Sequence, residues 1–346
     1  MKGQMYRTTK RALLRTAKAG GALTAVADSE WRRKRLLVLC YHGVSLDDEH
    51  RWNPGLYLPP ETFIQRMELL REGRYEVLPL DQALRLLNEG RLPARSVALT
   101  FDDGAQDFYT RAYPVLRKLD LPATLYLTTY YCGHQVPVFN TVCSYLVWKA
   151  IGKRIDAAGL LAEGGEVAIA DESAWRGVMA RILAHMRETN TPAERKDELA
   201  ASLAAQIGVD YAKIRTRRML HLMTPEQVAE VARNGVDIQL HTHRHRTPRE
   251  QTLFLREIED NARAIHAMTG RDGPLEHFCY PSGDYAEMFF PWLRQSGVRW
   301  ATTCVPGFAQ RGGDPLLVPR LLDASTLTPL EVEGWLTGFS AFLPRR

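Results

Sequence analysis

The fold of this chain is decided by two stretches, SVALTFDDG at residues 96–104 and VDIQLHTHRH at residues 236–245. Each begins with an apolar run typical of a buried β-strand and ends in polar side chains that can bind a metal ion. The first supplies the adjacent carboxylates Asp102 and Asp103, and the second supplies His241 and His245, four residues apart. Two imidazoles and one carboxylate can hold a divalent ion, which leaves the other carboxylate as a base. The pattern therefore favours a metal-dependent hydrolase.

The spacing of the two histidines predicts a sharp turn after the second strand. Positions i and i+4 lie about 13 Å apart in an extended strand, but about 5–6 Å apart on a helical turn. His241 and His245 can share one ion only if the chain curls directly after the strand. The following TPRE sequence, residues 247–250, is a capping-box signal and predicts a helix from Pro248. The histidines are then expected in a strand-to-helix loop at the carboxyl end of a strand, where α/β barrels place their chemistry.

Each motif also has a purely structural interpretation. Asp-Asp-Gly after a strand is by itself a common turn signal, and an isolated His-x-x-x-His pair is often solvated or part of a core. The combination favours the metal site, because both motifs end apolar strands and both precede helix-like segments.

The same residues resemble a known family. TFDDG together with His-Thr-x-x-His is similar to the polysaccharide deacetylases, the NodB-homology or carbohydrate esterase family 4 group. FCYPSG at residues 278–283 resembles that family's Phe-Arg-x-Pro-Tyr-Gly run. LCYHGV at residues 39–44 resembles the Tyr-His-x-Val strand of the subgroup that de-N-acetylates exopolysaccharide glucosamine polymers. The resemblance covers roughly residues 36–130 and 224–323.

The resemblance implies a role for each matching residue. Asp103, His241 and His245 would ligate the metal, and Asp102 would be the general base. The backbone N–H near Ser282 would contribute to the oxyanion hole. Histidine and carboxylate ligands suit Zn²⁺, which we expect, and also permit Co²⁺, Ni²⁺, Mn²⁺ or Fe²⁺.

The sequence motifs identify the general acid, and the residue that would hold the base Asp102 in place, less directly than they identify the metal ligands. The leaving amine of an amide needs a proton, and the Tyr-His-x-Val subgroup suggests His42 as its donor. A core histidine on a buried strand is the alternative. The chain departs from the family at Cys279, where many relatives have an arginine that braces the base, and it lacks a Leu-x-x-His near the last strand. Arg320, which ends LLVPR at residues 316–320, is our hypothesis for the brace of Asp102.

Apolar strand candidates alternate with helix-like segments along most of the chain. This alternation predicts an α/β fold with a parallel barrel, and the resemblance narrows it to an irregular (β/α)7-type barrel with a helical insertion. The expected strands are Leu36–Tyr41, Glu76–Leu80, Ser96–Phe101, Ala123–Thr128, Val236–Leu240, His277–Tyr280, Trp300–Cys304 and Leu316–Leu321.

The pattern breaks between Tyr130 and Met223, where helical periodicity replaces alternating strands. We predict a basic N-terminal arm (1–35), the deacetylase-like barrel (36–131 and 223–327), a helical insertion (132–222) and a C-terminal amphipathic helix (328–346). A role of the insertion in covering or selecting substrate and a role in packing or oligomerisation both stay open.

Positive charge is concentrated at the amino terminus. Residues 1–35 carry ten lysines and arginines against two acidic residues, whereas the whole chain has a net charge of only +5. A solvated basic arm and a helix resting on anionic lipid both fit this segment. Nucleic-acid binding is not expected, because no aromatic-lined binding motif accompanies the charge. The C-terminal helix is expected to dock on the barrel, with membrane contact as the alternative.

The cysteines and the amino-terminal segment indicate the cellular compartment in which the protein is expected. Five cysteines show no close pairing pattern, and the first 35 residues lack the apolar core of a signal peptide. The sequence contains no run of 18 apolar residues, so it does not predict a transmembrane helix. We therefore expect a cytoplasmic protein, with peripheral contact at the inner membrane as an open alternative.

The function favoured by the motifs and the resemblance is de-N-acetylation of an N-acetylated amino sugar in bacterial surface, exopolysaccharide or lipid-linked glycan biosynthesis. The expected partner is an amino-sugar glycan or a lipid-linked saccharide. Two alternatives stay open: metal-dependent amide hydrolysis on a small non-sugar molecule, and sugar binding without catalysis. An aromatic-lined groove would favour a sugar, and its candidates are Trp52, Tyr57, Tyr130 and Tyr131.

Overall fold

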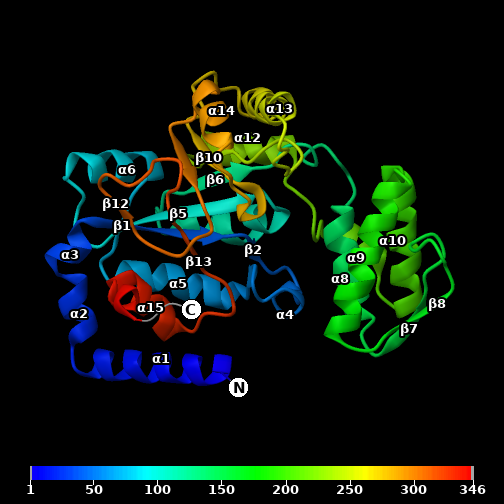
Figure 1. Cartoon of the computed structure of the whole chain (residues 1–346), viewed down its shortest axis with the longest axis horizontal. Coiled ribbons are helices and arrows are strands. Elements are labelled where there is room, and N and C mark those ends of the chain that lie inside the picture. Colours follow the sequence, from blue (N-terminus) through cyan, green and yellow to red (C-terminus); the bar gives the residue numbers. More distant parts are fainter. Residues whose placement is uncertain (1, 344–346) are drawn as a thin grey trace. The chain divides into compact units, whose positions relative to one another are not determined.

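A curled, mostly parallel sheet forms the centre of the larger of two units in the computed structural model of this chain (Figure 1). The structure describes residues 2–343. The first unit contains the residues up to 104, residues 108–130 and those from 225 on, and the second contains residues 105–107 and 131–224. Both sequence motifs therefore belong to the first unit.

Seven strands follow one another across the sheet in the order β11-β10-β9-β6-β5-β1-β12, while β13 attaches to β1 and β4 to β5. Only the pairing of β12 with β1 is antiparallel. The predicted irregular α/β barrel is thus confirmed, as a curled half-barrel. The strands are β1 (Arg35–Tyr41), β4 (Glu76–Val77), β5 (Ser96–Asp103), β6 (Thr124–Leu127), β9 (Asp237–Leu240), β10 (His277–Cys279), β11 (Trp300–Thr302), β12 (Ala309–Gln310) and β13 (Leu321–Leu322).

The strand register explains why the two motifs meet. Asp103 is the Cα partner of Leu127 in β6, and Leu127 is the partner of Leu240 in β9. His241 follows Leu240 directly. Neighbouring parallel strands lie about 4.8 Å apart and end at the same edge, so one strand alone separates Asp103 from His241.

Helices flank the sheet and bury their apolar stripes against it. In α6, residues 80, 83, 84 and 87 follow the helical i, i+3, i+4, i+7 pattern and pack against the sheet residues Leu36, Val38 and Ala98. The described helices of this unit are α1 (Lys2–Ala19), α2 (Ala22–Ala27), α3 (Glu30–Arg33), α4 (Glu49–Trp52), α5 (Pro60–Glu72), α6 (Leu80–Glu89), α7 (Tyr113–Lys118), α12 (Pro225–Arg233), α13 (Gln251–Thr269), α14 (Phe289–Gln295) and α15 (Pro329–Thr337). Shorter elements are the parallel pair β2 (Gly43–Val44) and β3 (Tyr57–Leu58), the π-helix η1 (Phe108–Ala112), and the 3-10 helices η2 (Pro281–Gly283) and η3 (Phe339–Phe342).

The N-terminal segment is not a solvated basic arm, one of the two interpretations that its sequence left open. Helix α1 lies against α15, and its Leu14 is completely buried in a small apolar cluster with Ala17. Arg11 pairs with Glu331 at 3.3 Å, and Lys18 pairs with Glu333 at 2.6 Å. That interpretation was wrong because the acidic partners of these basic side chains lie more than 300 residues away in the sequence.

The C-terminal helix docks on the unit, but it is shorter than expected. Thr328 and Glu331 form a capping box at the start of α15, in which the Glu331 carboxylate accepts the Thr328 N–H at 3.0 Å. Val332 and Leu336 of α15 are buried. The helix ends at Thr337 because Gly338 adopts a left-handed φ of 93°. The expected span of 328–346 was therefore too long, and residues 344–346 lie outside the described part of the chain.

Two local predictions also need correction. Helix α13 begins at Gln251 rather than Pro248, because Glu250 caps it by accepting the N–H groups of Thr252 and Leu253 at 2.9 Å each. The Thr247 hydroxyl, expected to be the cap, donates to Asp284 instead, at 2.9 Å. The strands expected at 76–80 and 316–321 shrink to the two-residue strands β4 and β13.

The second unit is mainly helical but also contains strands, which the sequence pattern did not predict. An antiparallel hairpin joins β7 (Lys153–Asp156) to β8 (Glu166–Ile169). It was missed because both strands are short and alternate weakly, with only Ile155 and Ile169 buried. The helices are α8 (Phe139–Lys149), α9 (Glu172–Glu188), α10 (Ala193–Ile207) and α11 (Tyr211–Thr216).

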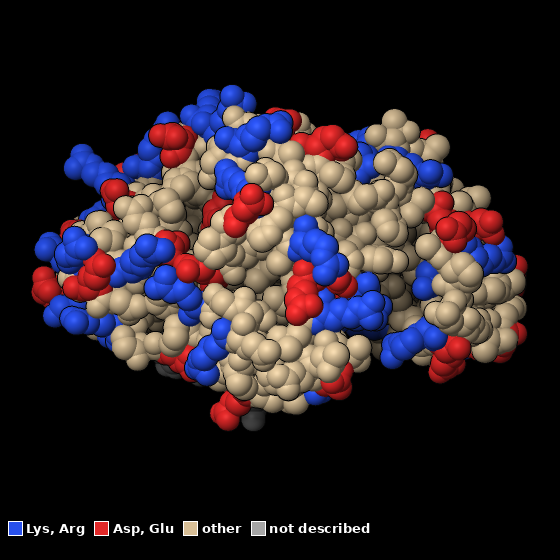
Figure 2. All heavy atoms as spheres, turned by 90° about the horizontal axis from the view of Figure 1, so that it is seen from above, with Lys and Arg blue, Asp and Glu red and all other residues tan. Residues whose placement is uncertain are grey.

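The surface shows no continuous basic face in the view of Figure 2, where lysine and arginine side chains are interspersed with aspartate and glutamate. Between residues 2 and 343, no helix combines the length and the apolar composition that a membrane span requires.

Candidate metal centre

Unusual backbone conformations occur at the last residue of β5 and in the loops that follow β9 and β10. Asp103 has a φ of 69°, Thr242 of 60°, His245 of 55°, and Ser282 after β10 of 57°. Non-glycine residues rarely adopt this left-handed region, and they cluster at functional sites where the surrounding fold holds them in place. The turn at 242–245 brings the His241 and His245 ring centroids to 5.0 Å, as the sequence spacing required.

Three of the predicted residues converge on one point. The Asp103 Oδ1 atom lies 3.2 Å from His241 Nε2 and 3.3 Å from His245 Nε2. A tetrahedral ion bonded at about 2.0–2.1 Å holds its ligand atoms about 3.3–3.4 Å apart. The observed spacing is therefore that of side chains arranged around a single small cation.

The hydrogen bonds around His241 show that a cation fits here. Its Nδ1 lies 2.8 Å from the backbone carbonyl of Cys279, which can only accept, so Nδ1 carries a proton and Nε2 is the nitrogen that the neutral imidazole offers to a metal ion. This nitrogen faces Asp103 Oδ1, a buried carboxylate oxygen without a hydrogen-bond donor in the described structure. Burial would lower the pKa of His241, but Cys279 and the nearby carboxylates raise it, so the site favours a positive charge at this point, and a divalent ion bound to the neutral imidazole supplies it.

Asn261, a residue that the sequence reasoning missed, fixes this loop. Its Oδ1 accepts the backbone N–H of His241 at 2.9 Å, and its Nδ2 donates to the Leu127 carbonyl at 2.9 Å and to Thr129 Oγ1 at 3.0 Å. Asn261 is completely buried on α13, in register with the apolar residues Phe254, Ile258 and Ile265 of the same helix face. A polar residue within an apolar helical stripe was the signal that could have identified it.

Asp102 lies beside the three ligands and is braced by Arg320. The guanidinium donates to both carboxylate oxygens, at 2.7 Å from Nη1 and 2.8 Å from Nη2. It also donates to Thr100 Oγ1 and to the Thr303 carbonyl, at 3.1 Å each. Burial by itself would raise the pKa of Asp102, but the adjacent Arg320 outweighs it and holds the pKa well below its usual range. The thiol of Cys279 lies 3.0 Å from Nη2, so Arg320 reaches the position that the sequence left without an arginine.

His42 and Ser282 are found at the same edge of the sheet. His42 Nε2 lies 3.6 Å from Asp102 Oδ2, and its side chain is 17% exposed, so it borders the site rather than packing in the core. Ser282 belongs to the loop directly after β10, and Cys279, the last residue of β10, supplies the carbonyl that orients His241. The structure thus brings all the predicted site residues to one end of the half-barrel.

Two of the four aromatic residues proposed as a sugar platform are buried and not available. Trp52 and Tyr57 are buried against each other, with ring centroids 5.9 Å apart, whereas Tyr130 is 40% exposed. That part of the prediction was wrong for Trp52 and Tyr57.

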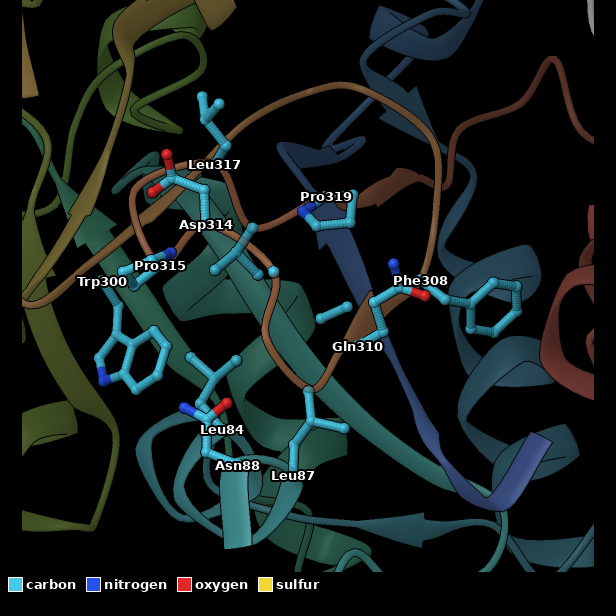
Figure 3. Close-up of a pocket in the computed structure, with 13 residues that line it drawn as sticks. Leu84, Leu87, Asn88, Trp300, Phe308, Gln310, Asp314, Pro315, Leu317 and Pro319 are labelled. Carbon is cyan, nitrogen blue, oxygen red and sulfur yellow. The ribbon is translucent and has the colours of Figure 1, made fainter. Parts of the chain in front are cut away.

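A separate cavity of about 210 Å³ is lined mainly by apolar side chains from α6, from the start of β11 and from residues 308–319 (Figure 3). Trp300, Leu84 and Pro319 are among them. None of the predicted catalytic or metal residues lines it. The candidate metal centre is therefore a different place in the structure.

Comparison with known proteins identifies the family. The model of the polysaccharide deacetylases matches residues 89–301, a span that includes both motifs. The chain belongs to the polysaccharide deacetylase family. This confirms the resemblance seen in its sequence.

Individual relatives are similar over part of their length. The chain is 32% identical over 102 residues to the Bacillus subtilis protein YxkH, covering 34% of it. It is 30% identical over 99 residues to the poly-beta-1,6-N-acetyl-D-glucosamine N-deacetylase of Escherichia coli, covering 14% of that protein. These matches cover 29% and 28% of this chain. The chain thus spans about a third or less of the curated relatives it matches.

Two solved structures share the fold. The deacetylase PplD of Streptococcus pyogenes superimposes with a TM-score of 0.56 at 18% identity, over 86% of this chain and 96% of that one. IcaB of Ammonifex degensii gives a TM-score of 0.52 at 18% identity, over 88% and 97% of the two chains.

Proposed function

We propose that this protein is a metal-dependent hydrolase that removes the acetyl group from an N-acetylated amino sugar. The observation that carries the proposal is that two carboxylates adjacent in the sequence, Asp102 and Asp103, have different surroundings. Asp103 Oδ1 faces two imidazole nitrogens at 3.2 and 3.3 Å, while Asp102 is held by Arg320. One carboxylate is thereby suited to hold an ion and the other to take a proton.

The metal would be held by Asp103, His241 and His245, and Zn²⁺ suits these ligands best, although Co²⁺, Ni²⁺, Mn²⁺ and Fe²⁺ also accept them. When bound, such an ion supplies Lewis acidity and lowers the pKa of a water molecule in its coordination sphere to about 7.

The remaining residues move protons and stabilise charge. Asp102, ionised because of Arg320, takes the proton of the attacking water. The backbone N–H of Ser282 donates to the developing oxyanion, a contribution of about 3–4 kcal/mol for one donor. His42 gives a proton to the departing amine, and proton transfer of this kind contributes about 10²–10⁴-fold. Arg320 keeps Asp102 charged and fixes the direction of its free lone pairs.

The substrate class is supported by the names of the relatives. Poly-beta-1,6-N-acetyl-D-glucosamine N-deacetylases are similar to this chain over their matching segments. We propose an amino-sugar glycan, with a lipid-linked saccharide as the form that a cytoplasmic enzyme would meet. All five cysteines are free thiols, as a reducing compartment requires. Leu13 of α1 and Phe342 of η3, whose side chains are exposed, are candidates for peripheral membrane contact.

The test measures acetate release from three substrates: N-acetylglucosamine oligomers, a lipid-linked N-acetylamino sugar and a small acetamide without a sugar. Asp102→Asn and Asp103→Asn are compared, with bound zinc determined in each. We expect D102N to keep the metal and lose about 10²–10⁴-fold in kcat, and D103N to lose both metal and activity. Wild-type rates in D102N, or release from the small acetamide alone, would contradict the proposal.

A further inference from the structure

Asp102 lies close to two further side chains of types that bind metal ions, Cys40 and His42. Cys40 Sγ lies 3.5 Å from Asp102 Oδ2, and His42 Nε2 lies 3.6 Å from the same oxygen. One ligand atom from each of Cys40, His42 and Asp102 lies within 4.8 Å of the others. This set shares no residue with the Asp103, His241 and His245 cluster.

The distances match those around an ion with mixed ligands. A tetrahedral zinc ion bonded to sulfur at about 2.3 Å and to oxygen at about 2.0–2.2 Å places these two atoms about 3.5 Å apart. The observed Cys40 Sγ to Asp102 Oδ2 distance is 3.5 Å. An imidazole nitrogen and an oxygen on such an ion lie about 3.3–3.4 Å apart, close to the 3.6 Å observed for His42 Nε2.

The two clusters differ in the ions they favour. Asp103, His241 and His245 offer only nitrogen and oxygen, whereas the second cluster adds the sulfur of Cys40. A thiolate ligand selects thiophilic ions such as Zn²⁺ and Cd²⁺ over Mn²⁺ or Mg²⁺. Asp102 Oδ2 accepts one hydrogen bond from Arg320 Nη2 at 2.8 Å and can offer a further lone pair to such an ion, while Arg320 Nη1 keeps its 2.7 Å hydrogen bond to Oδ1.

We propose that Cys40, His42 and Asp102 form a second, inhibitory cation site for a thiophilic divalent ion. On binding, the S–H bond of Cys40 breaks, its proton passes to solvent, and a sulfur–metal bond forms without any change in oxidation state. The ion reaches the site past His42, which is 17% exposed, because Asp102 is only 2% exposed and Cys40 is fully buried. Inhibition follows because the ion takes both the carboxylate oxygen and the imidazole that proton transfer needs; this part rests on the proposed function, whereas binding does not.

Titration of the zinc-loaded full-length chain with Cd²⁺ tests the site by ultraviolet absorption. Cadmium bound to a thiolate gives a sulfur-to-metal charge-transfer band, whereas cadmium that replaces zinc on Asp103, His241 and His245 has no sulfur ligand and gives none. We expect a band that saturates at one Cd²⁺ per chain and is lost in Cys40→Ser. Cys143→Ser is the matched control, since Cys143 is equally buried but lies on α8 of the second unit, and its band should persist.

Acetate release is followed in the same titration, each variant being compared with its own rate before cadmium is added. The wild type and C143S should be inhibited as the band grows, and C40S should resist. If circular dichroism shows that C40S does not fold, Cys40→Ala replaces it. In the wild type we then also measure whether bound Cd²⁺ protects the Cys40 thiol against an alkylating reagent. Absence of the band overturns the site, as does a band that survives in C40S and disappears in Cys279→Ser. A normal band in a protein without deacetylase activity leaves the site standing and refutes the proposed function instead.

Discussion

Two opposing effects act on the carboxylate of Asp102. Burial disfavours its charged form, and the bidentate contact with Arg320 more than compensates, so its pKa lies well below the usual range. The proposed base is therefore ionised whenever the protein is folded at neutral pH. The same contact weakens the case for an inactive sugar-binding protein, because it braces the base although position 279 carries a cysteine in place of the family's arginine.

Replacing Arg320 by methionine should raise the pKa of Asp102, because the main interaction that opposes the effect of burial would be lost. The acid limb of the pH profile of kcat/KM should move to higher pH, and activity at pH 7 should fall by about 10²-fold or more. Arg320→Lys keeps the charge and should shift the limb less. An acid limb that stays in place in R320M would show that Arg320 does not control the base.

The same substitution has a predictable effect on stability. In the wild type the folded-state pKa of Asp102 lies below its unfolded value of about 3.9. The pair therefore stabilises the fold above that pH, and this contribution is lost as the pH falls. R320M leaves a buried charge unpaired, so its free energy of unfolding in urea at pH 7 should drop by about 3–5 kcal/mol. The difference from wild type should narrow toward pH 3.

Single elements, rather than the whole barrel, hold the metal loop in position. Helix α13 reaches across β9 and β6 through Asn261, which accepts from His241 and donates to Leu127 and Thr129. The N–H of His241 and the Leu127 carbonyl would otherwise be buried without partners. A residue that touches neither metal nor substrate thereby sets the orientation of a ligand.

Asn261→Leu should weaken zinc binding by about 10–100-fold, because the backbone that carries His241 loses its anchor. Asn261→Asp keeps the acceptor for the His241 N–H but loses the two donated bonds, and should lie between wild type and N261L. Equilibrium dialysis against a zinc buffer measures the dissociation constants. Equal affinities in all three proteins would rule out a positioning role.

The elements also show what a sequence can and cannot predict. The strands that end in Asp102 and His241 were predictable, because continuous apolar runs mark buried parallel strands and such strands end at one edge. The contact of Arg320 with Asp102 could only be suggested, since 218 residues separate the two and no local pattern links them. The start of α13 was misplaced because Thr247 bonds to Asp284, a tertiary contact that outweighs a local capping signal.

If α1 docks on α15 through apolar packing, replacing its buried leucine should destabilise the fold, whereas replacing an exposed leucine should not. Leu14 is completely buried in the contact, whereas its neighbour Leu13 is 47% exposed. Leu14→Ala should lower the free energy of unfolding by about 2–5 kcal/mol, and Leu13→Ala should change it by no more than about 0.5 kcal/mol. Chemical denaturation monitored by tryptophan fluorescence compares the two. A free basic arm would make both substitutions equally harmless.

At the scale of the whole molecule, the candidate metal centre joins parts of the chain that precede and follow residues 131–224 in the sequence. Asp103 precedes residues 131–224, and His241 and His245 follow them. The left-handed conformations of Asp103 and His245 are held by a sheet whose strands come from both sides. A bound ion therefore links two distant segments of the first unit directly, while it contacts no residue of the second.

Zinc should consequently stabilise the first unit selectively. A ligand that binds only the folded state adds about 2.7 kcal/mol at a concentration 100 times its dissociation constant. Hydrogen exchange should slow in peptides that contain β5 and β9 when zinc is added, and should stay unchanged in those from α9 and α10. A chelator should reverse the effect in the wild type, and Asp103→Asn should show none, because without Asp103 the two histidines no longer face a carboxylate. Protection that spreads equally over both units, or that survives in D103N, would mean that the ion binds somewhere other than between these three side chains.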